Sequence, residues 1–278
     1  MRRIKIVADS ACDLFALKHT AFASAPMKVI TKEKEFIDDE NLDVEAMVLF
    51  MNDYKGKSQS SCPNTNDWLN AFGDAEDVFC VTITSGLSGS YNSACLAKQI
   101  YEKEGSGRRV FIVDSLSAGP EITMLVEKLD ECVERGMSYE EICEAITAYK
   151  ARTGLAFMLR SLKTFANNGR VSPLIAKAIG VLGICIVGKA SAQGTLEPLH
   201  KCRGERKSIE TLFDVLKAEG FCGGKVSIAH CRNAEMAQQL KELILSAHKD
   251  ALVDVHETKG LCSFYAENGG ILVGFEKA

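Results

Sequence analysis

The feature that most constrains this chain is a recurring pattern: a short apolar run ends in small polar residues and is followed by an amphipathic segment. Val78–Ile83 precedes Thr84 and Ser85, and a helical pattern follows from Ser90 to Lys103. Val110–Val113 ends in Asp114 and Ser115, with a helical pattern at 121–135. Strands that alternate with helices at this spacing pair in parallel through crossover helices. We therefore expect an α/β fold with an N-terminal, Rossmann-like parallel sheet.

Further elements are expected on either side of this pattern. Before it, strands are predicted at Ile4–Val7, Pro26–Ile30 and Glu35–Ile37, and helices at Leu42–Met51 and around Trp68, the latter capped by Asn64 or Thr65. After it, a helix capped by Ser138 is predicted to Tyr149, then a strand at Leu155–Met158, a helix at Ser161–Ala166 and a helix from Ser172-Pro173 into the apolar run 181–187. The last third predicts strands at Leu196–Leu199, Val226–Ala229, Leu252–His256 and Ile271–Phe275, with helices at 206–218 and 234–246.

The length of 278 residues predicts two domains, because about 150 residues per domain is a typical size. The pattern changes near residue 152. We expect an N-terminal α/β domain over residues 1–152 and a C-terminal α/β domain over 153–278, in which some neighbouring strands are antiparallel.

The turn from Thr84 to Gly89 has the composition of an anion site. It lies between a strand and the N-terminus of a helix, where backbone N–H groups lack partners and carry partial positive charge. Glycines allow an anion to approach the backbone, and Ser85 and Ser88 add hydroxyl donors. Ligands of parallel sheets bind beyond the carboxyl ends of the strands, so Asp9-Ser10 and Asp114-Ser115 are expected at the same edge.

Composition excludes several classes of protein. A net charge of −4 offers no basic footprint for nucleic acid. No leader is visible after Met1, and the longest apolar run, Ala178–Val187, is about half of the ~18 residues that a membrane span needs. We expect a cytoplasmic protein without stable membrane insertion. The eleven cysteines lack a Cys-x-x-Cys pair, so reduced thiols are expected, and Cys62 is noted because it lies in a polar segment.

Metal and nucleophile motifs are weak. The five histidines lack His-x-x-x-His spacing, and no metal or cofactor is predicted. The segment Gly86-Leu87-Ser88-Gly89-Ser90 misses the Gly-x-Ser-x-Gly nucleophile elbow at its last position, and no Gly-Lys-Ser/Thr ends the turn as in a P-loop. A serine-dependent acyl hydrolase or transferase that uses Ser85 or Ser88 stays as an alternative to a binding protein.

The turn also resembles a known signature. Ser85–Ala94 is similar to the Ser-x-Leu-Ser-Gly-Thr-Tyr-Gln-Ser-Ala motif of the DegV family of bacterial fatty-acid-binding proteins. Other segments match family motifs in the same order, and together they cover nearly the whole chain. They are Ala8-Asp9-Ser10, Ser60-Ser61-Cys62-Pro63, Val113-Asp114-Ser115 with Ala118-Gly119, Leu162 through Ser172, and Lys201–Lys207.

The resemblance implies a carrier, not an enzyme, which encloses one long-chain fatty acid between its domains and presents the carboxylate to a partner fatty acid kinase for acyl-phosphate formation. By residue match, Ser60 takes the place of a loop threonine that holds the carboxylate. The remaining head-group residues that it implies are Ser61, Thr84, Ser85, Ser88, Gly89 and Arg170. Arg203 is implied to face the kinase. The candidate lining of the acyl tunnel comprises Phe157, Leu159, Leu162, Ile175, Ile179 and Leu182.

One departure concerns the head group. Where the family has His-x-Gly-Pro-Gly, this chain has Tyr265-Ala266-Glu267-Asn268-Gly269. Tyr265 can contribute a hydrogen bond but no positive charge. A carrier of another amphipathic acid therefore stays open as a third interpretation.

Overall fold

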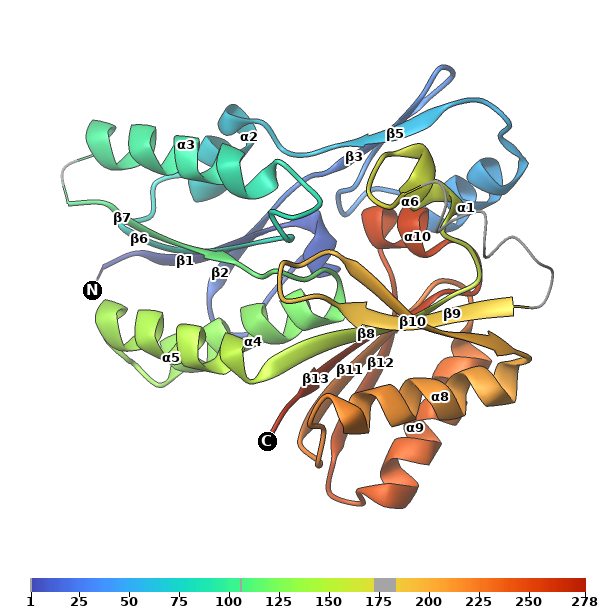
Figure 1. Ribbon diagram of the computed structural model, residues 1–278. Coiled ribbons are helices and arrows are strands. Elements are labelled where there is room, and N and C mark those ends of the chain that lie inside the picture. Colours follow the sequence, from blue (N-terminus) through green and yellow to red (C-terminus); the bar gives the residue numbers. More distant parts are fainter. Residues whose placement is uncertain (1, 106, 173–183) are drawn as a thin grey trace.

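The computed structural model describes residues 2–105, 107–172 and 184–278, which form three sheets with helices around them (Figure 1). The first sheet has the order β2-β1-β6-β7, and all its strands are parallel. Its strands are β1 (Ile4–Asp9), β2 (Ala21–Ala25), β6 (Asp77–Thr82) and β7 (Arg109–Asp114). The expected parallel α/β architecture is thereby confirmed.

Helices cover both faces of this sheet, as Figure 1 shows. One face packs on α2 (Thr65–Phe72) and α3 (Ser90–Glu104), and the other on α4 (Pro120–Glu134) and α5 (Tyr139–Ala151). Successive strand residues point to opposite faces, so in β1 Ile6 packs toward α4 and Val7 toward α2. Burial on both faces explains why these strands are continuous apolar runs.

A second, mixed sheet has the order β10-β9-β8-β13-β11-β12, in which only β11 and β12 pair in parallel. Its strands are β8 (Thr153–Leu159), β9 (Ile184–Ala190), β10 (Leu196–Arg203), β11 (Lys225–His230), β12 (Leu252–Glu257) and β13 (Ile271–Glu276). Helices α8 (Glu205–Ala218) and α9 (Ala234–Ala247) pack on this sheet (Figure 1). The antiparallel neighbours expected in this half are present.

A small third sheet, β4-β3-β5, joins the two halves. It comprises β3 (Lys28–Thr31), β4 (Glu35–Ile37) and β5 (Ser58–Ser61), and it packs with α1 (Val44–Asp53), α6 (Lys163–Asn167) and α10 (Gly260–Ala266). A short 3-10 turn, η1 (Ser10–Cys12), contacts α10. One apolar cluster here contains Phe36 and Phe157, which come from the first and the second half of the chain.

Several start signals in the sequence are confirmed. Asn64 and Ser138 each cap their helix in a full capping box, with Asp67 and Glu141 as reciprocal partners. The starts of α2 and α5 were therefore predicted correctly. Asp43, which caps α1, and Pro120, in the first turn of α4, were not singled out from the sequence.

Other expectations were wrong or incomplete. Ile184–Val187, expected at the end of a helix, belongs to strand β9, which pairs with β8 and β10. The preceding part of that predicted helix, 173–183, lies outside the described residues, as do Ile175, Ile179 and Leu182. Ser58–Ser61 is a strand and not a polar loop, while β2 and α10 were not expected. The division between residues 152 and 153 stays a prediction.

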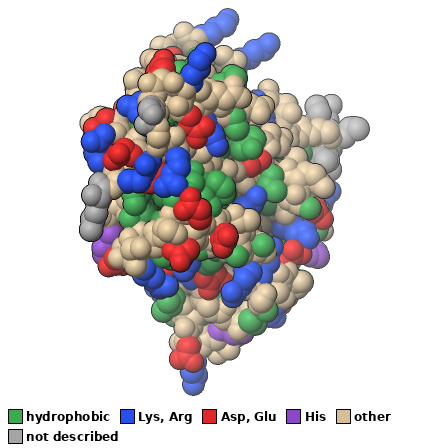
Figure 2. Space-filling view, turned by 90° about the vertical axis from the view of Figure 1, so that its left-hand side faces the viewer, with side chains coloured by type: hydrophobic (Ala, Val, Ile, Leu, Met, Phe, Trp, Pro, Cys, Tyr) green, Lys and Arg blue, Asp and Glu red, His purple; other side chains and the backbone are tan. Residues whose placement is uncertain are grey.

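On the face shown in Figure 2, basic and acidic side chains are interspersed. Opposite charges also pair directly: the buried Asp77 pairs with both Arg2 and Arg109, each at 2.8 Å, and Arg109 also pairs with Glu140. All eleven cysteines are free thiols, as expected. Over the described parts of the chain, no helix is long and apolar enough to cross a membrane.

Candidate functional site

The polar residues that end the parallel strands meet at one sheet edge, as expected, but they mostly bond to one another. The buried Oδ2 atom of Asp9 accepts hydrogen bonds from the Ile83 amide at 2.9 Å and the Ser90 hydroxyl at 2.5 Å. Burial raises the pKa of Asp9 to about 7. Asp114 accepts a hydrogen bond from the Ser85 amide at 3.1 Å. These carboxylates therefore hold the Thr84–Gly89 turn in shape.

The first half of that turn is covered by the hairpin between β9 and β10. A Cβ on Gly86 would lie 2.5 Å from the carbonyl oxygen of Gln193, so only glycine fits there. Thr84 is buried, and its hydroxyl accepts a hydrogen bond from the Gly86 amide. Ser85 is exposed on the outside of the turn. Thr84 and Ser85, both predicted for the head group, therefore do not line the cavity at the second half of the turn.

The second half of the turn borders a cavity of about 60 Å³, which has room for a carboxyl group, since one water occupies about 30 Å³. Five of the residues predicted for the head group line it: Ser60, Ser88, Gly89, Arg170 and Tyr265. The other lining residues are Met27, Cys62, Ile83, Leu87, Phe165 and Leu261. Four polar side chains and a helix N-terminus thus share a small, mainly apolar chamber.

Ser60 and Tyr265 form the central polar contact of this chamber. Their hydroxyl oxygens lie 2.7 Å apart, and the Ser60 amide donates to Oδ1 of Asn168 at 3.3 Å. The Tyr265 ring packs against the Phe165 ring, with centroids 4.7 Å apart. Strand β5, the segment after α6 and helix α10 therefore fix one another at this point.

Arg170 brings a positive charge to the chamber. Its Nε donates to the carbonyl oxygen of Leu87 at 3.2 Å, and its Nη1 donates to that of Asn168. Within the described residues it forms no ion pair with a carboxylate. A guanidinium that has hydrogen bonds but no counter-ion is suited to receive an acidic ligand group.

The other polar groups of the chamber are neutral. Burial raises the pKa of Tyr265, whose hydroxyl therefore keeps its proton at neutral pH and can donate it in a hydrogen bond. Burial also raises the pKa of Cys62, which keeps the thiol protonated and poorly nucleophilic. Gly89, the N-cap of α3, provides no capping side chain, so the first turn of that helix has no cap from this residue.

Two other predicted residues lie outside the chamber. The Ser61 hydroxyl donates to the neighbouring carbonyl oxygen of Cys62 at 3.3 Å. Arg203 is exposed at the end of β10, opposite the hairpin that covers Thr84. Of the candidate tunnel residues, Phe157, Leu159 and Leu162 are buried in one apolar cluster, which also contacts Phe165 and Tyr265.

Several lining residues were not singled out from the sequence. Met27 and Leu261 come from segments whose approach to the chamber depends on the third sheet and on α10, and nothing local in the sequence indicated that approach. Phe165 had a usable signal, because it lies in the same expected helix–turn segment as Arg170. Across the described chain, no group of three or more His, Cys, Asp or Glu residues is placed to hold a metal ion.

The parallel sheet with its crossover helices, the mixed sheet and the small third sheet define an α/β protein in which a polar chamber lies beside an apolar cluster. The family model described as "Uncharacterised protein, DegV family" matches residues 3–277. The chain belongs to the DegV family.

Curated and solved relatives agree with this assignment. A DegV domain-containing protein of Streptococcus pneumoniae strain R6 is 44% identical over 276 residues, which are 98% of each chain. The structure of a DegV family protein of Eubacterium eligens, loaded with heptadecanoic acid, is 42% identical with a TM-score of 0.96 over 99% of this chain and 100% of that one. The Fatty Acid Kinase (Fak) B3 protein of S. pneumoniae, loaded with linoleic acid, is 43% identical with a TM-score of 0.97 over 99% of each chain.

Proposed function

We propose that this protein binds one long-chain fatty acid, with the carboxylate in the chamber between Ser60, Arg170 and Tyr265. The observation that carries the proposal is the Ser60–Tyr265 hydroxyl pair, 2.7 Å apart, in a chamber that Arg170 also lines. Two hydroxyls and a guanidinium that forms no ion pair within the described residues together match the acceptor oxygens and the charge of a carboxylate. Fatty acids bound to relatives more than 40% identical support this choice of ligand.

The acyl chain would run from the chamber into the apolar cluster that contains Phe157, Leu159 and Leu162, between the two predicted domains 1–152 and 153–278. Burial of a sixteen-carbon chain at ~0.8 kcal/mol per methylene amounts to roughly 10 kcal/mol before association costs are subtracted. A hydrogen bond to the charged head contributes about 1.5–3 kcal/mol. Chain burial therefore sets the affinity, and the chamber sets the requirement for an acid.

The second half of the proposal is that the protein presents the bound carboxylate to a partner fatty acid kinase, which forms the acyl phosphate. The likeness to a Fatty Acid Kinase B3 protein supports it. In this role the protein is a cytoplasmic carrier without a cofactor of its own, and the exposed Arg203 belongs to the face that meets the kinase.

The alternative of a serine hydrolase or transferase gains no support from the described contacts. Neither Ser85 nor Ser88 donates a hydrogen bond to a histidine in the described residues, whereas a serine nucleophile needs such a base to accept its proton. A fluorophosphonate probe separates the classes, because a carrier without an activated serine stays unlabelled. A displacement assay with straight-chain, unsaturated and cyclic acids addresses a carrier of another amphipathic acid.

The site itself is tested with two serine variants of the same strand. Ser60→Ala removes the hydroxyl that contacts Tyr265, while Ser58→Ala removes a hydroxyl of β5 two residues away that does not line the chamber. Displacement of a fluorescent fatty acid should show affinity about ten- to a hundredfold lower for Ser60→Ala, as expected for loss of one hydrogen bond to the charged head, and unchanged affinity for Ser58→Ala. Equal affinities in the two variants would place the head group elsewhere.

A further inference from the structure

Glu267 has a backbone conformation that side chains rarely adopt. It directly follows α10, with φ 55° and ψ 175°. This region is almost exclusively populated by glycine, because a Cβ crowds the backbone there. Its backbone is held on both sides, since its amide donates to the Ser263 carbonyl at 3.0 Å and its carbonyl accepts from the Gly270 amide at 3.2 Å. A non-glycine residue persists in such a conformation only when its surroundings hold it there.

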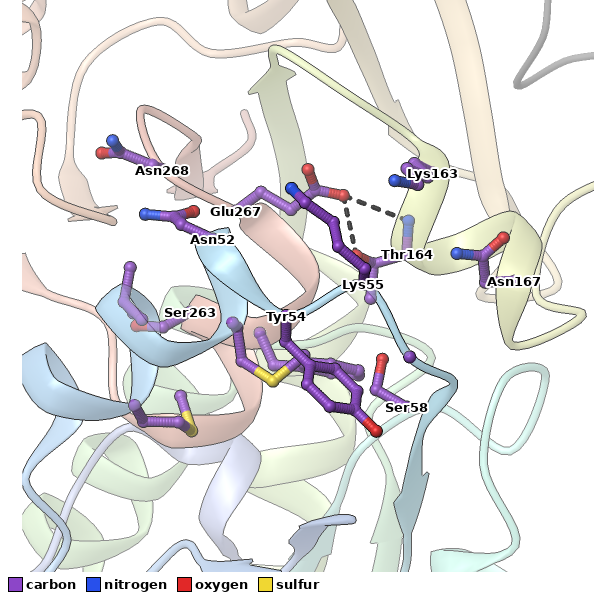
Figure 3. A pocket seen from close by; sticks show the side chains of 15 residues that line it. Asn52, Tyr54, Lys55, Ser58, Lys163, Thr164, Asn167, Ser263, Glu267 and Asn268 are labelled. Carbon is purple, nitrogen blue, oxygen red and sulfur yellow. Dashed lines mark hydrogen bonds between the residues drawn. The ribbon is translucent and has the colours of Figure 1, made fainter. Parts of the chain in front are cut away.

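The Glu267 carboxylate binds the start of α6. Its Oε1 accepts hydrogen bonds from the Thr164 hydroxyl at 2.8 Å, the Thr164 amide at 3.1 Å and the Ser161 hydroxyl at 3.2 Å. Figure 3 shows the two bonds to Thr164, at the border of a second cavity of about 250 Å³ between α1, α6 and α10. A single carboxylate oxygen thus anchors the first turn of a five-residue helix that has no cap from its own N-cap residue, Leu162.

The anchored segment leads directly to the acid chamber. The carbonyl oxygen of Thr164 accepts hydrogen bonds from the amide and the side-chain Nδ2 of Asn168, at 3.1 and 2.9 Å. The side-chain oxygen of Asn168 in turn accepts from the Ser60 amide, and Ser60 contacts Tyr265. Since Tyr265 lies two residues before Glu267, these contacts close a ring around the site.

We infer that Glu267 is a positioning residue of the head-group chamber: its carboxylate fixes α6, and through Asn168 and Arg170 it sets the geometry in which a carboxylic acid is distinguished from an uncharged head group. This inference rests on the proposed function. Glu267 itself does not line the chamber, so it acts through the segment it holds. A glycine at this position would relieve the backbone strain but would also remove the anchor.

The quantity to measure is the ratio of the affinities for palmitic acid and for the corresponding alcohol. Each affinity is obtained from displacement of a fluorescent fatty acid from the protein. Glu267→Gly removes the anchor and the backbone strain together. We expect about a tenfold smaller acid-to-alcohol ratio, comparable to loss of one charged hydrogen bond, with the melting temperature not reduced by more than about 3 °C. Glu267→Gln, which keeps an acceptor oxygen, should stay within about threefold of the wild-type ratio.

Two further variants complete the test. Thr164→Val removes one donor to Glu267 without changing the backbone, and it should lower the ratio about threefold. Arg232→Gly is the matched control, because Arg232 also has a positive φ of 51° but pairs with Glu45 outside the ring. Its ratio should equal that of the wild type.

Unchanged ratios in both Glu267→Gly and Thr164→Val would overturn the positioning role while leaving the proposed function intact. An equal loss of affinity for acid and alcohol in these variants would also overturn it, because that result indicates general disruption. A wild-type protein that binds neither compound would overturn the proposed function and this inference together.

Discussion

The hydroxyl oxygens of Ser60 and Tyr265 lie 2.7 Å apart, although 205 residues separate them in the chain. One comes from an edge strand of the small sheet and the other from α10. Their contact joins the two halves of the chain at the chamber that also contains Arg170. The position of each hydroxyl therefore depends on the other.

Tyr265→Phe should weaken binding of palmitic acid about ten- to a hundredfold, because one hydrogen bond to the charged head, which contributes about 1.5–3 kcal/mol, is lost while the ring still packs on Phe165. Isothermal titration measures the affinity. Tyr149→Phe is the control, since Tyr149 bonds to Glu276 away from the chamber. Equal affinities for Tyr265→Phe and wild type would contradict a head-group role.

Arg170→Gln should weaken acid binding about ten- to a hundredfold, because a charged partner of the carboxylate contributes about 1.5–3 kcal/mol. Affinity for the matching alcohol should change much less. Arg135→Gln, an exposed arginine after α4, serves as control. If the arginine acted only through packing, acid and alcohol would lose affinity equally in Arg170→Gln.

Arg203→Ala should leave fatty acid binding unchanged and reduce acyl-phosphate formation by a fatty acid kinase about tenfold, as expected for a charged contact at a protein interface. Acyl phosphate is trapped with hydroxylamine and quantified. Lys249→Ala removes an exposed charge elsewhere and should have no effect. Full phosphorylation with Arg203→Ala would move the kinase contact to another surface.

Stability should fall as pH rises, because of Asp13. Burial raises the pKa of Asp13 to about 8, while its partner, the Lys259 amide, only partly offsets this. A carboxyl whose folded pKa exceeds its unfolded value stabilises the fold below the unfolded pKa, and that contribution is lost as pH rises through the folded pKa. Between pH 5 and pH 8 the free energy of unfolding should fall by up to about 1.4 kcal/mol per pH unit from this group.

Asp13→Asn keeps an acceptor for the Lys259 amide and removes the titration. The free energy of unfolding, measured with urea at pH 5, 6, 7 and 8, should therefore depend less on pH for this variant than for the wild type. The stability of the variant relative to the wild type should be highest at pH 8. A variant profile parallel to that of the wild type would show that Asp13 ionises freely in the folded protein.

The sequence predicted the parts of this fold that local signals determine. Capping residues and apolar runs located α2, α5 and the central parallel strands, because Asn64 and Ser138 act within their own first turn. Strand β9 was missed because an apolar run such as Ile184–Val187 suits a buried helix as well as a strand. Its partners β8 and β10 decide between the two.

The other elements that were missed form through contacts between residues that lie far apart in the sequence. Ser58–Ser61 has no apolar alternation and becomes a strand by pairing with β3. Helix α10 lacks a local cap, since the Gly260 and Leu261 amides donate to Asp38, more than 220 residues earlier. That helix carries Tyr265 to the chamber. The sequence could therefore name Tyr265 as a candidate, but not show that it meets Ser60.

The most direct test of the central claim is mass spectrometry of lipids extracted from the purified full-length protein. Our account predicts close to one long-chain fatty acid per chain, or rapid uptake of one labelled palmitate by protein stripped of lipid. Protein that is empty as purified and takes up no labelled palmitate would contradict it.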